Sequence, residues 1–154
     1  MVRPRAEQPT PAELEVLKIV WDREGPATVR EVLEGLNRSE SPARAYTTVM
    51  SLMNVMAEKG LLIREPQGRA FAYRAAAPRE QTLRSLVGET LQKAFSGSAS
   101  LLVAHLLDQS RPSAEELERI RALIDAYDRD RDQDNPNAKG GDGCRPLRPR
   151  RPRA

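Results

Sequence analysis

The sequence predicts a mainly α-helical chain with one small β-hairpin. Three observations lead to this fold class. Apolar residues recur at helical spacing in six separate segments, and the period changes to an alternation only over residues 61–74. Capping residues or glycine and proline stand at the ends of most of these segments. A hydrophobic content of 39% with 4% aromatic residues fits a helical core of modest size.

The first part of the chain predicts three helices. Thr10, Pro11 and Glu13 form a capping-box pattern that opens a helix ending before Gly25-Pro26. A second box at residues 28–31 opens another helix. A polar connection, residues 37–42, then leads into a third helix over residues 43–59, which Gly60 ends.

The hairpin follows the third helix. Residues 61–74 predict two short strands around a turn at Pro66-Gln67-Gly68, with Phe71 and Tyr73 on one face of the second strand. Three helices followed by a hairpin is the order of a winged helix-turn-helix domain. Another small α+β domain is the alternative interpretation.

The second part predicts three more helices. The first covers about residues 79–95, and after a break at residues 96–100 the second covers residues 101–107. The third follows a capping segment at residues 111–116. About fifty residues in thin amphipathic helices enclose little core alone, which favours self-association. The last helix has the seam spacing of paired helices at positions 117, 120, 124 and 127. The residues expected at the dimer interface are Leu83, Leu91, Leu102, Leu106, Leu117, Ile120, Ile124 and Tyr127.

We therefore expect four parts. Residues 1–9 are a disordered N-terminus, residues 10–77 the winged helix-turn-helix domain, and residues 78–131 the helical dimerisation domain. Residues 132–154 have no apolar periodicity and predict a disordered Arg/Pro-rich tail.

Composition argues against catalysis and metal binding. A single cysteine, Cys144, and a single histidine, His105, allow neither an intrachain disulfide nor a Cys/His zinc cluster, so no enzyme, metal or cofactor is expected. No long apolar stretch is present, and a cytoplasmic protein without a membrane partner is expected. The pI near 9.3 is weak evidence for nucleic acid, because the tail carries six Lys/Arg against three Asp/Glu.

The third helix has an unusual outward face. At 100° per residue, Ala45, Val49, Leu52, Met53 and Met56 lie on the inner side. The outer side is short, polar and nearly uncharged: Arg44, Thr47, Ser51, Asn54 and Glu58, flanked by Thr48 and Val55. Hydroxyl and amide groups of this size fit close to base edges in a major groove. The alternative is that the hydroxyls only serve the first helical turn, which does not explain residues spread over two turns.

Arginines surround the predicted hairpin turn. Arg64, Arg69 and Arg74 stand where a wing would meet phosphates or a minor groove. The alternative is a solvated strand edge that charge protects from pairing.

At these motifs the sequence resembles the penicillinase-repressor family of BlaI/MecI-type winged-helix transcriptional regulators. The resemblance rests on ELEVLKIVWDREGPATVREVLEGL, AYTTVMSLMNVMAEKGLLIRE and GRAFAYRAAAPRE and covers about residues 10–128. It implies a homodimeric repressor on a palindromic operator in double-stranded DNA. By position, base reading falls to Thr47, Thr48 and Ser51, and the wing contact to Arg69.

The sequence departs from the family pattern in three places. Family members often carry an arginine where this chain has Asn54-Val55-Met56. Inducible members are inactivated by cutting an Asn-Phe bond, and the matching position here is Ala104-His105. A sensor or a protease that triggers release is therefore a candidate partner. The cysteine-containing hook of the copper-responsive CopY branch is absent, since Cys144 stands alone.

Two other functions stay open on sequence grounds. One is a winged-helix protein-interaction module, and the other is a small-molecule-responsive regulator with a pocket between the head and the dimer helices. His105 is interpreted as an interface or core histidine, with a pH switch as the alternative. Cys144 is interpreted as an exposed thiol, and the tail arginines as a solvated segment or a weak, sequence-independent attraction for DNA.

Overall fold

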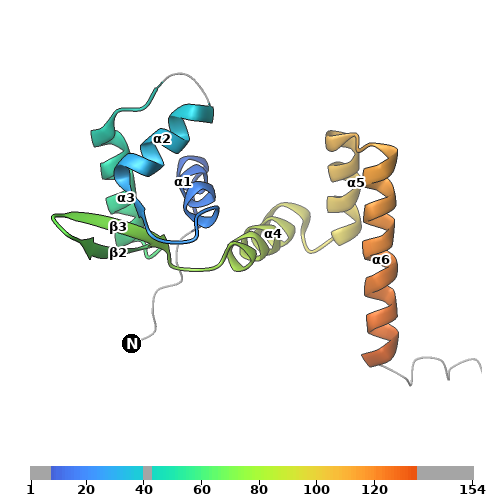
Figure 1. The fold of residues 1–154 in the computed structure, drawn as a ribbon. Coiled ribbons are helices and arrows are strands. Elements are labelled where there is room, and N and C mark those ends of the chain that lie inside the picture. The colour runs from blue at the N-terminus through green and yellow to red at the C-terminus, as the bar shows by residue number, and fades with distance from the viewer. Residues whose placement is uncertain (1–7, 40–42, 135–154) are drawn as a thin grey trace, which may run out of the picture. The chain divides into compact units, whose positions relative to one another are not determined.

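The computed structural model describes residues 8–39 and 43–134 and forms two compact units, one ending at Ala99 and the other starting at Ser100. The first unit contains α1 (Pro11–Trp21), β1 (Ala27–Thr28), α2 (Val29–Ser39), α3 (Tyr46–Glu58), β2 (Leu62–Gln67), β3 (Ala70–Ala75) and α4 (Arg79–Phe95). The second contains α5 (Ala99–Ser110) and α6 (Ala114–Asp134), which run in opposite directions (Figure 1). The predicted fold class, mainly helical with a winged helix-turn-helix, is confirmed.

Both predicted capping boxes are present. The Thr10 hydroxyl accepts from the Glu13 N–H at 3.3 Å, and the Thr10 N–H donates to the Glu13 carboxylate at 2.9 Å. Thr28 and Glu31 make the same pair of bonds at the start of α2, at 3.3 and 2.8 Å. Each box satisfies two backbone donors that a helix start leaves without partners, and such caps contribute about 1 kcal/mol each.

The core lies among α1, α2, α3 and the base of the hairpin. α1 packs against β3, and α3 packs against β2. Within each helix the buried side chains recur at helical spacing, and a fully buried Leu, Val or Met contributes about 1.5–3 kcal/mol. The buried hydrophobic residues of this core are Val16, Leu17, Val20, Ala27, Val29, Val32, Leu36, Val49, Met53, Met56, Leu61, Leu62 and Tyr73.

The sheet has three strands in the order β1-β3-β2, all antiparallel, so one strand was missed from the sequence. β1 is only two residues long, which is too short for an alternation of apolar and polar residues to be recognised. The turn was also misplaced: Gln67 pairs with Ala70, so the turn residues are Gly68 and Arg69. Gly68 has φ +63°, which glycine adopts without strain. Pro66 is tolerated within β2 because β2 is an edge strand.

α3 begins at Tyr46 rather than at residue 43. Ala45 precedes it with extended backbone and an exposed side chain, so its expected place on the inner side is wrong. The helix ends at Glu58, one residue before the predicted end, and the predicted stop at Gly60 has φ +80°. The N–H groups of Leu61 and Gly60 donate to the carbonyls of Met56 (2.9 Å) and Ala57 (3.2 Å), the pattern of a Schellman motif.

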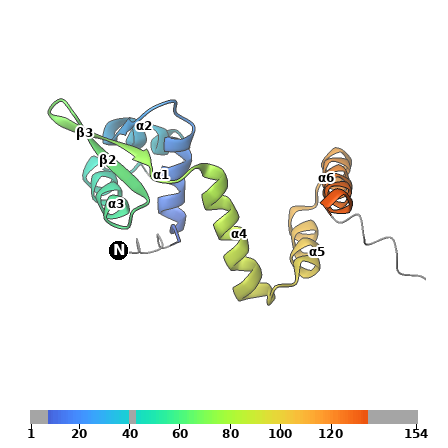
Figure 2. The ribbon, with the colours of Figure 1, turned by 90° about the horizontal axis from the view of Figure 1, so that it is seen from below.

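The hairpin tip projects beyond α3, as two views at right angles show (Figures 1 and 2). A projecting antiparallel hairpin after a helix-turn-helix is the wing that the sequence predicts. Its base is held by packing on α3, and its tip is open to solvent.

The C-terminal helices are longer than expected. α5 covers residues 99–110 instead of 101–107, and α6 reaches Asp134, so residues 132–134 are helical and not disordered. Aspartate and arginine alternate at the end of α6, which places unlike charges three residues apart and supports the helix. The rest of the predicted tail, with Cys144, and residues 1–7 lie outside the described residues.

α4 matches its predicted range, but it belongs to the same unit as the head, whereas the sequence placed a domain boundary at residue 78. The Trp21 indole N–H donates to the Ala77 carbonyl (3.1 Å), and the Gln8 amide donates to the Ser85 hydroxyl (3.0 Å). In the part of the chain that the structure describes, no helix is long and apolar enough to span a bilayer.

Candidate nucleic-acid interface

The outward face of α3 carries short hydroxyl side chains. Val49, Met53 and Met56 are buried on its inner side. Thr47, Thr48 and Ser51 are exposed, and within the described residues none of their side chains makes a hydrogen bond. Their hydroxyls are therefore available to an external partner.

Two other predicted site residues are engaged within the protein: Asn54 on α3, and Arg44, which precedes α3 instead of lying in its first turn. Asn54 is half-buried, and its side-chain oxygen accepts from the Tyr73 hydroxyl of β3 at 2.8 Å. The Arg44 guanidinium lies 2.5 Å from the Glu15 carboxylate of α1, and the Arg44 N–H donates to the Asn37 side chain at 2.8 Å. Both residues hold α3 in place at the edges of its hydroxyl face.

The C-terminal end of α3 is also tied to α1. The Lys59 ammonium lies 2.8 Å from the Glu13 carboxylate, which is 2% exposed. Burial raises the pKa of Glu13, but the bonds from Lys59 and Thr10 together outweigh burial, so the pKa is lowered. α3 is thus fixed to α1 at both ends, by Arg44–Glu15 and Lys59–Glu13.

We expect this buried carboxylate to make the head sensitive to acid. A lowered native pKa stabilises the fold above the unfolded value of about 4.3, and the stabilisation is lost as pH falls through the native pKa. Glu13→Gln should cost about 1–3 kcal/mol of unfolding free energy at pH 7, because Lys59 and Thr10 lose a charged partner.

Chemical denaturation at pH 7 and pH 3 measures this effect. The difference between wild type and Glu13→Gln should shrink at pH 3, because the stabilisation from the lowered pKa of Glu13 declines once the pH is below the unfolded value. Glu24→Gln, on an exposed residue without an ion pair in the described part of the chain, is the matched control and should change little at either pH. A deficit of Glu13→Gln that persists unchanged at pH 3 would contradict the account.

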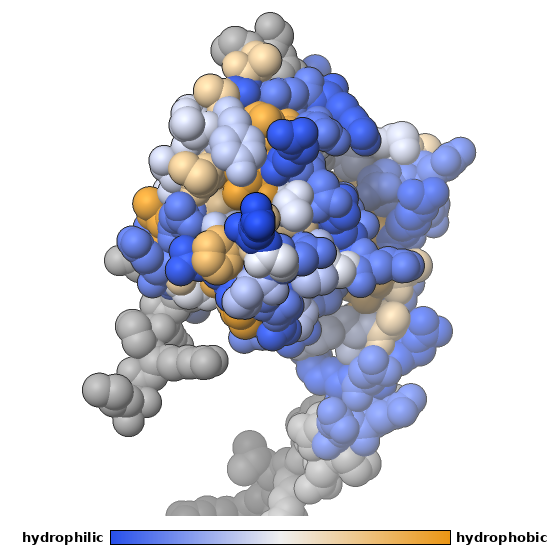
Figure 3. All heavy atoms as spheres, turned by 60° about the vertical axis from the view of Figure 1, so that its left-hand side comes forward, coloured by the Kyte–Doolittle hydropathy of each residue, from blue (hydrophilic) through white to orange (hydrophobic). Residues whose placement is uncertain are grey.

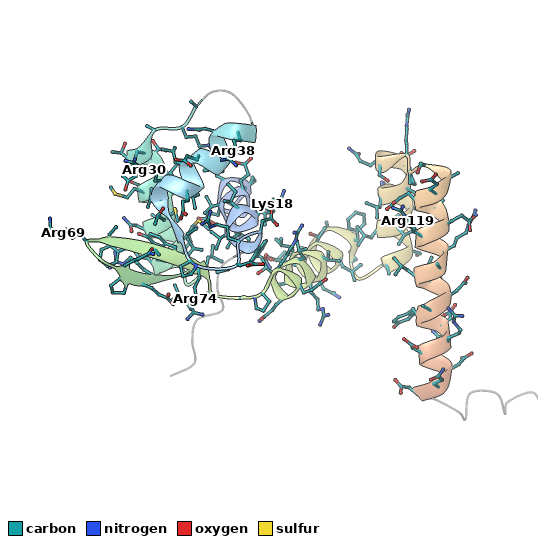
Figure 4. The ribbon with its side chains drawn as sticks, viewed as in Figure 1. Lys18, Arg30, Arg38, Arg69, Arg74 and Arg119 are labelled. Atoms are coloured by element: carbon teal, nitrogen blue, oxygen red, sulfur yellow. The ribbon has the colours of Figure 1, made fainter. Side chains whose placement is uncertain are left out.

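The cations of the head fall into two groups. Arg23, Arg44, Lys59 and Arg74 are each paired with a carboxylate. Five cations of residues 8–78 form no ion pair with any described residue: Lys18, Arg30, Arg38, Arg64 and Arg69. Figure 4 shows Arg30 and Arg69 on the side of the head where α3 lies, and Lys18 and Arg38 on the other side. Unpaired positive charge therefore flanks the hydroxyl face.

Arg30 was not singled out from the sequence. It lies in the first turn of α2, where a cation is unfavourable because the helix dipole is positive. A basic residue inside a capping box is thus a signal, since an external anion would remove the penalty.

Apolar side chains are also exposed on the part of the head formed by α3 and the wing. A view toward it shows apolar patches among hydrophilic atoms (Figure 3). The exposed large hydrophobic residues of α3 and the wing are Tyr46, Met50, Val55, Ile63 and Phe71. Val55 occupies the place where the family often has arginine, and it offers an apolar contact there instead of a charge. On α3, such groups suit thymine methyls and the sugar edges of a groove.

The residues expected at a dimer interface are accessible in the single chain. None of the side chains of α4, α5 or α6 is buried. Leu83, Leu91, Leu102, Leu117 and Ile120 are half-buried, and Leu106, Ile124 and Tyr127 are exposed. His105 is exposed on α5.

The described residues contain no group of three or more His, Cys, Asp or Glu side chains able to hold a metal ion. The head combines a helix-turn-helix, an open hydroxyl face on its second helix, and a projecting wing with an unpaired arginine at its tip. These features define the class of winged-helix DNA-binding proteins.

Comparison with known proteins agrees with this class. The family model described as penicillinase repressor matches residues 9–126. The transcriptional regulator BlaI of Mycobacterium tuberculosis is 32% identical over 113 residues, which are 73% of this chain and 79% of that protein. The penicillinase repressor of Bacillus licheniformis is 24% identical over 118 residues, 75% of this chain and 88% of that protein.

A solution structure of monomeric B. licheniformis BlaI in complex with the blaP half-operator aligns with 49% of this chain and 89% of its own, at 25% identity and a TM-score of 0.42. The family match and the mycobacterial relative decide the assignment. The chain belongs to the penicillinase repressor family, a family of transcriptional repressors and not of enzymes.

Proposed function

We propose that this protein is a homodimeric, sequence-specific DNA-binding repressor that recognises a palindromic operator in double-stranded DNA. One observation carries the proposal. Thr47, Thr48 and Ser51 form an exposed hydroxyl face on α3 that no described side chain satisfies, flanked by the unpaired Arg30 and Arg69. Membership in the penicillinase repressor family supports a cytoplasmic location.

In this proposal α3 enters the major groove and the flanking arginines bind the backbone. Threonine and serine hydroxyls both donate and accept, and a threonine methyl packs on a thymine methyl. Arg30 and Arg69 contact phosphates on either side and set the position of the helix in the groove. Arg44 and Asn54 border this surface, and their bonds to Glu15 and Tyr73 hold the helix at the required angle.

The dimer is proposed from the apolar side chains that α4, α5 and α6 leave exposed. Val87 is 56% exposed, Ile124 52% and Tyr127 69%. Exposed apolar residues recurring at helical spacing, rather than singly, mark an association surface. A symmetric dimer would present two α3 helices to two half-sites, which is why the operator is expected to be palindromic.

Duplex binding in solution tests the function. An operator is selected from a pool of random duplexes, and its affinity is compared with that of an unrelated duplex at several salt concentrations. Sedimentation gives the mass of the free protein and the stoichiometry on DNA. Protection of a palindromic site upstream of the protein's own gene would support repression. Absence of any salt-dependent duplex binding would instead favour a protein-interaction module.

A second candidate function is response to a small molecule. A hollow of about 920 Å³ lies inside the first unit, lined by α1, the segment around Leu61 and the polar side of α4. Leu17, Gln81, Ser85 and Gln92 contribute apolar surface and hydrogen-bonding groups to it. This volume suits a small effector. A ligand that raises the melting temperature and lowers operator affinity would identify such a response.

Release from DNA is expected not to use the family's cut. Ala104 and His105 lie in the middle of α5, whose backbone is hydrogen-bonded and must open before cleavage. They also lack the amide and the aromatic ring of an Asn-Phe site. A protease whose binding site contacts those groups discriminates strongly against a substrate without them. A cut between α4 and α5, at residues 96–98, or an effector should act instead.

Intact-mass measurement on protein from cells exposed to a β-lactam checks this expectation. Fragments meeting at Ala104 and His105 would contradict it. Full-length protein, or a cut within residues 96–98, would agree with it.

A further inference from the structure

The three arginines of the wing have different environments. Arg74 lies 2.5 Å from the Glu65 carboxylate, so its charge is neutralised. Arg69 follows Gly68 in the turn. The Arg64 guanidinium lies over the Phe71 ring, 4.5 Å from its centroid, and forms no ion pair with any described residue.

The strand register shows which of them faces α3. Arg64 pairs directly with Tyr73, so the two side chains point to the same face of the hairpin. Tyr73 is buried, and its hydroxyl donates to Asn54 of α3. Arg74 is one residue further along β3 and therefore points to the opposite face. Arg64 is on the α3 side, and Arg74 is not.

We infer that Arg64, held over Phe71, is a phosphate-binding residue of the wing and contacts the backbone strand that borders the groove occupied by α3. The inference rests on the proposed function. Arg64 stands next to α3 through the Tyr73–Asn54 bond, and the edge of a major groove is a phosphate strand. Arg69 lies at least about 10 Å further toward the tip, since three strand residues separate Arg64 from the turn, so it reaches beyond that strand.

Phe71 gives Arg64 a fixed position. A guanidinium stacked on a ring keeps its in-plane N–H donors free for phosphate oxygens. Phe71 is 46% exposed, so the guanidinium stacked on its ring is held at the protein surface. Stacking lowers the number of conformations that the arginine loses on binding, and so favours the complex.

Salt-dependent binding to the selected operator tests the role of Arg64. Arg64→Ala should weaken binding and reduce the slope of log K against log salt by about 0.9, the value for one phosphate contact. Arg74→Ala is the matched control: it removes the same side chain from the opposite face and should leave the slope unchanged. Thermal melting verifies that each variant folds.

A double-mutant cycle tests the role of Phe71. Phe71→Leu should weaken binding in the wild-type background and have no further effect in Arg64→Ala, because the ring acts through the arginine. An unchanged slope for Arg64→Ala, or an equal loss for Arg74→Ala, would overturn the inference while the proposed function stands. Wild-type protein that binds no duplex would overturn both.

Discussion

Replacing Ile124 and Tyr127 together by aspartate is expected to turn the dimer into a monomer and to weaken operator binding by on the order of 10²–10⁴-fold. Both residues lie on the exposed apolar side of α6. Association would bury two carboxylates per chain in an apolar seam, which costs more than the interface gains. Each monomer would then bind a single half-site, and the gain in affinity from binding both half-sites together would be lost.

Sedimentation and operator titration measure this result. The matched control is Ala122→Asp with Gln133→Asp, which introduces the same two negative charges on the opposite side of α6. The control should stay dimeric. A stable monomeric wild type, or a dimeric Ile124→Asp/Tyr127→Asp variant with full affinity, would contradict the proposed assembly.

Removing single hydroxyls from α3 is expected to have the second largest effect. Thr47→Ala and Ser51→Ala should each lose about 1–3 kcal/mol of affinity for the selected operator, while binding to unrelated duplexes changes little. Both side chains are exposed and make no hydrogen bond within the described chain, so folding stability should be kept.

The ratio of specific to nonspecific affinity separates base reading from general attraction. Ser85→Ala removes a hydroxyl from α4, where it accepts from Gln8, and should leave this ratio unchanged. Arg69→Ala should lower affinity for all duplexes and reduce the salt slope. If Thr47→Ala and Ser51→Ala bind like wild type, α3 does not read bases with this face.

Much of the site could be predicted because it lies on one helix. The helical period alone separates Val49 and Met53 from Thr47 and Ser51, and the structure has the same facing. The period fails at Ala45, because that residue precedes the first helical turn. The apolar sides of α4 and α6 were predicted in the same way.

Pairings between distant segments could not be predicted. Glu13 caps its own helix as the box pattern predicts, but its bond to Lys59 joins residues that lie far apart in the chain. Arg64 and Arg74 look alike in sequence, and only the register of β2 on β3 directs one toward α3 and the other toward Glu65. β1 exists because Ala27 and Thr28 lie against β3.

By itself the sequence determined the order of helices and hairpin, both capping boxes and the hydroxyl face of α3. Each depends on side chains within a few residues of one another, where periodicity and capping are local physics. The tertiary structure decided which charges are neutralised, how α3 is held at both ends and which wing arginine lies beside it. These features depend on which residues tertiary packing brings next to each side chain, and a local sequence pattern carries no information about residues far apart in the chain.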